Sequence, residues 1–120
     1  MLQPNAIILY VENLAITARF YEDLLGLKPK ESSPTFQSFQ LTNGMGLGLK
    51  SKQSVLPTAE ANSSGELAFI LDNHRKVDEL YTEWQNKGPS IALPPTALPY
   101  GYTFLALDPD GNRLRVVSLN

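Results

Sequence analysis

Two stretches of the chain carry the same order of apolar and polar positions. In the first, residues 6–11 form a short apolar run typical of a strand, and Asn13 follows as a candidate helix N-cap. Gly26 stands where a helix commonly ends in a left-handed residue. Between these two positions, apolar residues recur at helical spacing at Leu14, Ala18, Tyr21 and Leu25. The pattern predicts a strand followed by an amphipathic helix.

The second stretch repeats this pattern in the other half of the chain. Residues 67–71 form the apolar run, Asp72 or Asn73 is the candidate N-cap, and Gly88 is the expected end of the helix. The face predicted to be buried consists of Val77, Leu80, Tyr81 and Trp84. This spacing favours a core position for the tryptophan over an exposed stacking surface.

Each predicted helix is followed by a predicted β-hairpin. In the first half the strands are residues 37–42 and 46–50, joined at an Asn-Gly turn. In the second half they are residues 102–107 and 113–119, joined by Asp-Pro-Asp-Gly-Asn. The proline-rich segment 92–101 is expected to be a loop.

These elements predict an α+β fold built from two βαβββ modules. We expect a single domain over residues 1–120, with module one at 1–50 and module two at 66–120. The intervening segment 51–65 is rich in Ser, Ala, Asn and Gly and is expected to be a linker.

Composition narrows the class of protein. A chain with 42% hydrophobic and 18% charged residues is expected to fold, and a net charge of −2 with scattered basic residues argues against nucleic-acid binding. Without cysteine and with one histidine, the chain cannot form thiolate or multi-histidine metal sites. The first residues resemble no signal peptide and no apolar run is long enough for a membrane span, so we expect a cytoplasmic protein with no membrane partner.

Two motifs resemble a known family. Tyr-Val-Glu-Asn at residues 10–13, followed by Phe-Tyr at 20–21 and Leu-Leu-Gly-Leu at 24–27, resembles the opening of the vicinal oxygen chelate superfamily. That superfamily includes glyoxalase I, bleomycin-binding proteins, extradiol dioxygenases and fosfomycin-resistance enzymes. Residues 104–112 are similar to its closing hairpin, so with the repeated pattern the resemblance covers nearly the whole chain. These motifs cap helices and form turns, and are therefore specific for the fold rather than the function.

The resemblance implies a curved mixed sheet around a cavity, of the glyoxalase/bleomycin-resistance type, commonly completed by a homodimer. The superfamily's metal enzymes take ligands from the first and last strands of each module. The matching positions here are Ala6, Gly48, Glu66 and Arg115. Only Glu66 can bind a cation through its side chain, because a guanidinium has no lone pair to offer. Since a catalytic divalent site needs about three protein ligands, we expect no metal and no other cofactor.

Glu66 and Arg115 are expected to face one site, because the family's geometry brings both positions together in one module. A carboxylate and a guanidinium there can pair bidentately in the place of a metal. We hypothesise that the pair orients a polar group of a ligand; the alternative is a structural or exposed ion pair of small effect.

Aromatic residues supply the other candidate ligand contacts. Tyr10 shares a strand face with Ala6 and Ile8, which is expected to look into the cavity while the alternate residues pack on helices. Four more aromatic residues lie near the second strand of each module: Phe36, Phe39, Tyr100 and Tyr102. Such residues bind planar ligands well, although filling the core is their commoner role.

Glycines recur at period two at residues 44, 46 and 48. On a strand they either widen the cavity or let a neighbouring backbone approach closely. Of the remaining polar residues, His74 is expected to be exposed in the first turn of the second helix, and Asp108 and Asp110 are explained by turn formation.

The favoured function is metal-independent binding and sequestration of a small planar aromatic compound. The pattern, with arginine at the last-strand position in place of glutamate, is similar to the phenazine-resistance type of the superfamily. The alternative is a glyoxalase- or isomerase-like lyase that uses Glu66 as a general base, with or without a weakly bound divalent metal. A third reading is a structural or regulatory subunit with a vestigial cavity. Apart from the alternative role of Glu66, no catalytic residue is expected.

Overall fold

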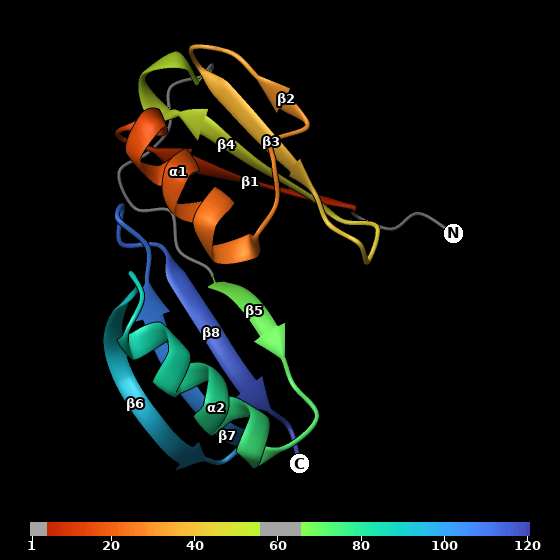
Figure 1. Ribbon diagram of the computed structural model, residues 1–120, viewed down its shortest axis with the longest axis vertical. Coiled ribbons are helices and arrows are strands. Elements are labelled where there is room, and N and C mark those ends of the chain that lie inside the picture. Colours follow the sequence, from red (N-terminus) through yellow and green to blue (C-terminus); the bar gives the residue numbers. More distant parts are fainter. Residues whose placement is uncertain (1–4, 56–65) are drawn as a thin grey trace. The chain divides into compact units, whose positions relative to one another are not determined.

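The computed structural model describes residues 5–55 and 66–120, and the chain divides into two compact units, Met1–Asn62 and Ser63–Asn120. Unit one contains β1 (Ala6–Val11), α1 (Leu14–Leu25), β2 (Glu31–Ser32), β3 (Phe36–Gln40) and β4 (Gly46–Ser51), followed by the 3₁₀ turn η1 (Lys52–Ser54). Unit two contains β5 (Glu66–Ile70), α2 (His74–Gln85), β6 (Ser90–Leu98), β7 (Gly101–Leu107) and β8 (Arg113–Ser118). Each unit is thus a βαβββ module, as predicted (Figure 1).

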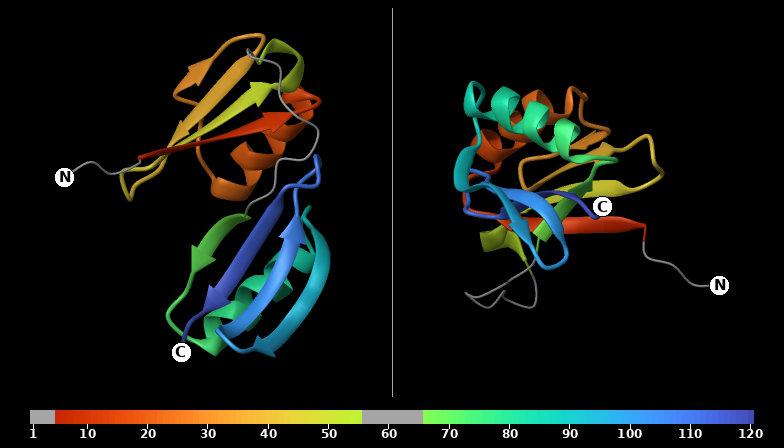
Figure 2. Two further views of the ribbon diagram at one scale, coloured as in Figure 1. Left: turned by 180° about the vertical axis from the view of Figure 1, so that it is seen from behind. Right: turned by 90° about the horizontal axis from the view of Figure 1, so that it is seen from below.

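Both units have the same mixed sheet. The strand order is β1-β4-β3-β2 in unit one and β5-β8-β7-β6 in unit two. The first strand of each unit runs parallel to the last, and the other neighbours are antiparallel. Each sheet carries its helix on one face, which leaves the opposite face without a helix of the same unit (Figures 1 and 2). We call these opposite faces the helix-free faces.

The two cores lie between each helix and its sheet. In unit one, Tyr21 of α1 and Phe39 and Leu47 of the sheet are almost fully buried. In unit two, Trp84 of α2 contacts the rings of Phe69 and Phe104 edge-on, at centroid distances of 5.6 and 5.5 Å. The prediction that Trp84 is a core residue is therefore confirmed.

An asparagine N-cap precedes each helix. The side chain of Asn13 accepts the N–H of Ile16, and that of Asn73 accepts the N–H of Lys76, which makes Asn73 rather than Asp72 the cap of α2. Gly26 ends α1 in the left-handed conformation, with φ of 66°.

The predicted end of the second helix at Gly88 is wrong, because α2 ends three residues earlier at Gln85. The N–H groups of Asn86 and Lys87 bond to carbonyls only three residues back, which tightens and closes the last turn. Gly88, with φ of 82°, then redirects the chain before Pro89.

The predicted loop at residues 92–101 is also wrong, because most of it belongs to β6. This strand lies at the edge of its sheet, where proline removes no necessary ladder hydrogen bond. Pro94 and Pro95 fall at a register shift between the Leu93–Leu105 and Thr96–Thr103 pairs. Irregular pairing at an edge therefore accommodates a sequence that otherwise indicates a loop.

The two hairpin turns are formed by short polar side chains. Asp108 accepts the N–H groups of Asp110 and Asn112, each at 2.8 Å, which confirms its interpretation as a turn residue. Asn43 accepts the N–H of Met45 in the other turn, and Gly44 has φ of 93° there.

Part of the predicted linker 51–65 is structured. Ser51 ends β4, Lys52–Ser54 form η1, and Val55 is buried. Residues 56–65 lie outside the described part of the chain, as do residues 1–4, where no signal peptide is expected.

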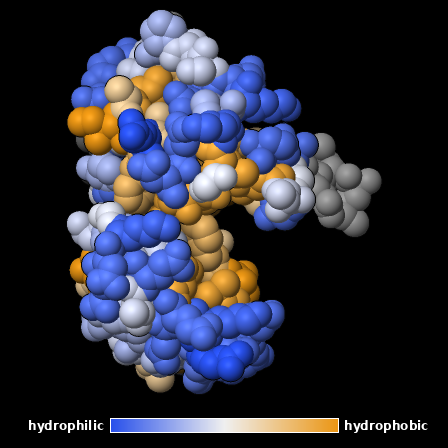
Figure 3. Space-filling model, viewed as in Figure 1, coloured by the Kyte–Doolittle hydropathy of each residue, from blue (hydrophilic) through white to orange (hydrophobic). Residues whose placement is uncertain are grey.

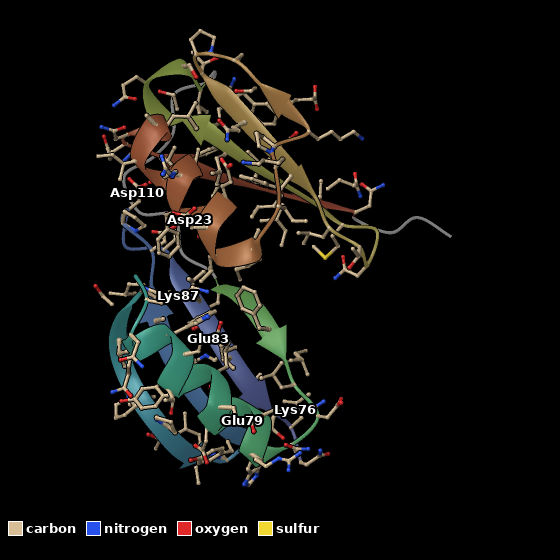
Figure 4. All side chains as sticks on the ribbon, in the orientation of Figure 1. Asp23, Lys76, Glu79, Glu83, Lys87 and Asp110 are labelled. Atoms are coloured by element: carbon tan, nitrogen blue, oxygen red, sulfur yellow. The ribbon has the colours of Figure 1, made fainter. Side chains whose placement is uncertain are left out.

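The outer face of α2 is strongly polar. Lys76, Glu79 and Glu83 of α2, and Lys87 just after it, are exposed and are labelled in Figure 4; the helix side of unit two is largely hydrophilic in Figure 3. Among the described residues, neither helix is both long and apolar enough to cross a bilayer.

Candidate ligand-binding site

Strand alternation places the candidate polar residues on the helix-free face of unit two. Phe69 and Phe104 pack on α2, so the alternate residues of their strands point to the other face. Glu66 on β5 lies on that face, together with Arg115 on β8, whose neighbours Leu114 and Val116 are fully buried. The two residues come from strands that pair directly, which brings them within reach of each other.

Glu66 and Arg115 form the bidentate ion pair that was expected. Nη2 of Arg115 donates to Oε2 of Glu66 at 2.8 Å, and Nε donates to Oε1 at 3.2 Å. The Arg115 side chain is only 14% exposed and that of Glu66 is 33% exposed. This fork geometry restrains both side chains more than an ordinary surface pair does.

The pair holds both groups in their charged forms. The hydrogen bonds from Arg115 lower the pKa of Glu66 below its ordinary value of 4.5, against the opposing effect of partial burial, and nearby Arg113 acts in the same direction. The same contact raises the pKa of Arg115. Glu66 is therefore an ionised hydrogen-bond acceptor and a weaker base than a free carboxylate.

Three further residues surround Arg115. Buried Thr103 accepts from Nη1 of Arg115 at 3.3 Å and donates to the Val116 carbonyl at 2.7 Å. The guanidinium carbon lies 5.9 Å from the centre of the Tyr100 ring. Arg113 places Nη1 3.6 Å from Oε2 of Glu66.

Thr103 and Arg113 are not singled out by the hydrophobic pattern, although two signals point to them. Thr103 is a hydroxyl residue within the apolar run 102–107. Arg113 precedes Arg115 by two residues, and period two places both on one face of a strand.

The helix-free face of unit one has a different character. A shallow hollow of about 170 Å³ lies there, and we call it the unit-one hollow. It is lined by Ala6, Ile8, Phe36 and Gly48, with Lys30, Glu31, Ser38 and Gln40 among its polar residues. Ala6 and Gly48 thus leave an apolar concavity where Glu66 and Arg115 stand in unit two.

Gly48 makes room for the ring of Phe36. A Cβ atom at residue 48 would lie 2.9 Å from the Phe36 ring and 3.2 Å from Ile8 Cγ1. At Gly46, by contrast, an added Cβ would meet Ala6 Cβ at an ordinary 3.8 Å. The sequence left open either a wider cavity or the close approach of a backbone; in the structure, the glycine at 48 admits a neighbouring side chain and also lines the unit-one hollow.

The predicted aromatic residues divide between the two faces. Tyr10 and Phe36 lie on the helix-free face of unit one, and Tyr100 lies beside Arg115 in unit two. Phe39 is only 1% exposed and its side chain faces the helix, although the residue is also among those that line the unit-one hollow, so its ligand contact stays a prediction. Its register partner Leu47 is buried on the same face.

Tyr102 also lies on the helix side of its sheet, away from Glu66 and Arg115. Its hydroxyl donates to Asp78 of α2 at 2.6 Å, and this hydrogen bond raises the pKa of Tyr102. Its ring stacks on His74 at 4.5 Å. His74 is exposed in the first turn of α2, as expected, and its Nε2 lies 3.0 Å from the Asn120 carbonyl.

The residues at the family's metal-ligand positions do not fit a divalent ion. Ala6 and Gly48 have no side-chain donor atoms, and both carboxylate oxygens of Glu66 accept hydrogen bonds from Arg115. Within residues 5–55 and 66–120, no three His, Asp or Glu side chains gather closely enough to hold a metal.

Comparison with known proteins identifies the family. The sequence profile of the Glyoxalase/Bleomycin resistance protein/Dioxygenase superfamily matches residues 3–116. The chain is 30% identical to the phenazine antibiotic resistance protein EhpR of Enterobacter agglomerans over 120 residues, covering 98% of this chain and 92% of that protein.

Solved structures agree with this assignment. Protein ATC0852 from Agrobacterium tumefaciens is 45% identical, with a TM-score of 0.90 and coverage of 100% of this chain and 99% of that one. A glyoxalase-related enzyme from Fulvimarina pelagi is 25% identical, with a TM-score of 0.83 and coverage of 98% and 88%. The chain belongs to the glyoxalase/bleomycin resistance protein/dioxygenase superfamily.

Proposed function

We propose that this protein binds and sequesters a small planar aromatic compound without the help of a metal ion. The observation that carries the proposal is the bidentate Glu66–Arg115 pair, which stands at two of the family's metal-ligand positions. A partly exposed, oriented pair of this kind presents fixed hydrogen-bonding groups to a ligand. Tyr100 beside it adds an aromatic surface.

The helix-free face of unit one supports the same proposal. Its hollow has an apolar lining that includes the ring of Phe36, and exposed Tyr10 lies on the same face. Aromatic and aliphatic walls suit a planar ring system. The similarity to EhpR, which is named as a phenazine antibiotic resistance protein, favours an antibiotic-like compound of the phenazine class.

The lyase alternative receives support from the similarity to a glyoxalase-related enzyme but less from the geometry. A general base works best with a pKa near the operating pH. Arg115 instead lowers the pKa of Glu66 and occupies both of its oxygens. Binding without chemistry is therefore the better-supported function.

We further propose that the working form is a homodimer. Ligand pockets commonly enclose about 300–1,000 Å³, whereas the unit-one hollow measures about 170 Å³. The large apolar side chains Ile8, Tyr10 and Ile70 are exposed on the helix-free faces. A second copy of the chain would cover such surfaces. Light scattering during size-exclusion chromatography should give twice the mass of one chain, and a monomer at all concentrations would oppose this.

Calorimetric titration with phenazine tests the binding function. We expect saturable binding that is unchanged by EDTA, and recovery of phenazine unaltered by mass spectrometry after prolonged incubation. Conversion of the compound, or binding that requires an added divalent metal, would favour the lyase alternative.

Two variants locate the site. Arg115→Met should weaken phenazine binding by about tenfold if one good contact is lost, and Phe36→Ala tests separately whether the unit-one hollow takes part. Phe20→Ala on α1, a partly buried aromatic beside Tyr21, is the control for general loss of aromatic packing. Unchanged affinity in Arg115→Met would remove the pair from the binding site.

A further inference from the structure

Arg113 and Arg115 differ in how firmly Glu66 holds them. Arg115 makes two hydrogen bonds to Glu66 and one to Thr103, and its side chain is 14% exposed. Arg113 lies 3.6 Å from Glu66 at its nearest nitrogen, and its side chain is 57% exposed. The guanidinium of Arg115 is therefore fixed, whereas that of Arg113 can turn towards another partner at a small cost in free energy.

The charges of Glu66, Arg113 and Arg115 do not cancel. Glu66 is held ionised by Arg115, so one negative charge faces two guanidiniums. The cluster of Glu66, Arg113 and Arg115 therefore carries one net positive charge. Because Glu66 already occupies the inner edge of Arg115, the unmatched charge belongs mainly to Arg113.

An aromatic ring lies next to Arg115, the other arginine of this cluster. The ring of Tyr100 packs over the guanidinium of Arg115, and the tyrosine is itself well exposed. A flat ring that lies against Tyr100 is beside Arg115, and Arg113 follows on the same face of β8, two residues away in the same unit. Guanidinium forks bind carboxylates bidentately, which suits a planar acid better than a neutral compound.

We propose that the ligand is an aromatic acid, and that Arg113 binds its anionic group with help from the outward N–H groups of Arg115. This inference rests on the proposed binding function and deepens it by naming the chemical class of the ligand. Arg113 is then a specificity-determining residue, and Glu66 is a positioning residue that holds Arg115 and competes with the ligand for Arg113.

The test compares phenazine-1-carboxylate with its neutral carboxamide. The two compounds share the same ring system, and only the first carries a charge. Calorimetry at neutral pH and low salt should show the acid binding about tenfold more tightly than the amide. This preference should shrink as salt is added, because the contact is partly exposed.

Arg113→Met should bring the affinity for the acid close to that for the amide, because it should weaken binding of the amide much less than binding of the acid. Its matched control is Arg75→Met, an exposed arginine on α2 at the opposite face of the sheet, which should keep the full preference. Because the Arg113 side chain is mostly exposed, the variant should fold normally, and circular dichroism verifies this.

Glu66→Gln distinguishes most clearly between competition of Glu66 with the ligand and the other roles of this residue. Glutamine keeps an acceptor for Arg115 but removes the competing charge, so the acid should bind more tightly, by about threefold or more. A role for Glu66 as a general base or metal ligand predicts no such gain.

The possible results distinguish a failure of this inference from a failure of the proposed binding function. Equal binding of acid and amide by the wild-type protein would overturn the inference and leave the binding function standing. Weaker acid binding in Glu66→Gln would also overturn it. Binding of neither probe, nor of phenazine itself, would overturn both.

Discussion

The helix-covered faces of the two units are alike, whereas their helix-free faces differ in chemistry. Each helix has 12 residues, begins at an asparagine cap and buries an aromatic residue against the sheet. On the opposite face, the register pair Ala6–Gly46 of unit one corresponds to Glu66–Arg113 of unit two. The next pair on that face, Ile8–Gly48, corresponds to Ala68–Arg115. One scaffold thus presents an apolar hollow in one unit and an ionic cluster in the other.

This difference shows which positions the fold constrains. Residues facing the helix must fill a closed space, so they remain apolar and closely packed in both units. Residues on the helix-free face need only be compatible with a strand, and can therefore change from glycine to arginine. Binding chemistry is expected at these less constrained positions. The following predictions test this division, beginning with the largest effect.

Phe104→Ala should cause the largest loss of stability, because it empties the helix-facing core of unit two. Phe104 is fully buried and contacts both Tyr81 and Trp84. We expect the free energy of unfolding to fall by about 3–5 kcal/mol, measured by urea denaturation with circular dichroism. Exposed Glu79→Ala is the control and should change it by less than about 0.5 kcal/mol. A small loss at Phe104 would contradict the assignment of this face as core.

Gly48→Ala should reduce stability by about 1 kcal/mol, at the low end for overpacking, because the Phe36 ring can shift outwards. Gly46→Ala, whose added atom meets only an ordinary contact, is the matched control and should be nearly neutral. The double variant Gly48→Ala, Phe36→Leu should recover most of the loss. If Gly46→Ala costs as much as Gly48→Ala, the packing of Phe36 on Gly48 is not the cause.

Asn13→Ala and Asn73→Ala should each reduce stability by about 1 kcal/mol, since each removes one N-cap hydrogen bond. Similar losses of stability in the two variants would show that the N-caps of α1 and α2 contribute equally to the two units. Asp72→Ala should cost less than Asn73→Ala, because the side chain of Asp72 forms an exposed ion pair with Lys76. The reverse order would assign the cap to Asp72.

The smallest effect should be a pH dependence of the free energy of unfolding that arises from Glu66 in unit two. The folded pKa of Glu66 lies below its ordinary value of 4.5, so its contribution to stability is present above that value and is lost as pH falls through the folded pKa. Because Glu66 is one-third exposed, the contribution should be less than about 1 kcal/mol. The stability difference between wild type and Glu66→Gln should therefore shrink as the pH is lowered from about 6 to about 3. A difference that grows on acidification would contradict the lowered pKa.

The elements and their faces were largely predictable from the sequence. Helix caps, the alternation of strands and the closing turn depend on residues within a few positions of one another, and the structure confirms Asn13, Gly26 and Asp108 in these roles. The Glu66–Arg115 contact was predictable as well, but only through the family resemblance, because 48 residues separate the two positions.

The errors have a common physical cause. Segment 92–101 looks like a loop in isolation, and only its place at the edge of a sheet makes β6 compatible with Pro94 and Pro95. The sheet faces of Phe39 and Tyr102 were likewise not predictable from the sequence, and their ligand contact stays a prediction. Their faces depend on strand register, and each turns towards its helix.

The sequence by itself determined the two βαβββ modules and the cap at Asn13, because periodicity and turn chemistry are local properties. It left the second cap open between Asp72 and Asn73, and the residues at the family's metal-ligand positions were identified only through the family resemblance. Only the tertiary structure decided that Phe36 covers Gly48, that Thr103 and Tyr100 hold Arg115, and that Arg113 shares Glu66 while remaining exposed. These contacts join residues brought together by strand pairing. Their geometry follows from the register between strands, which local patterns do not specify.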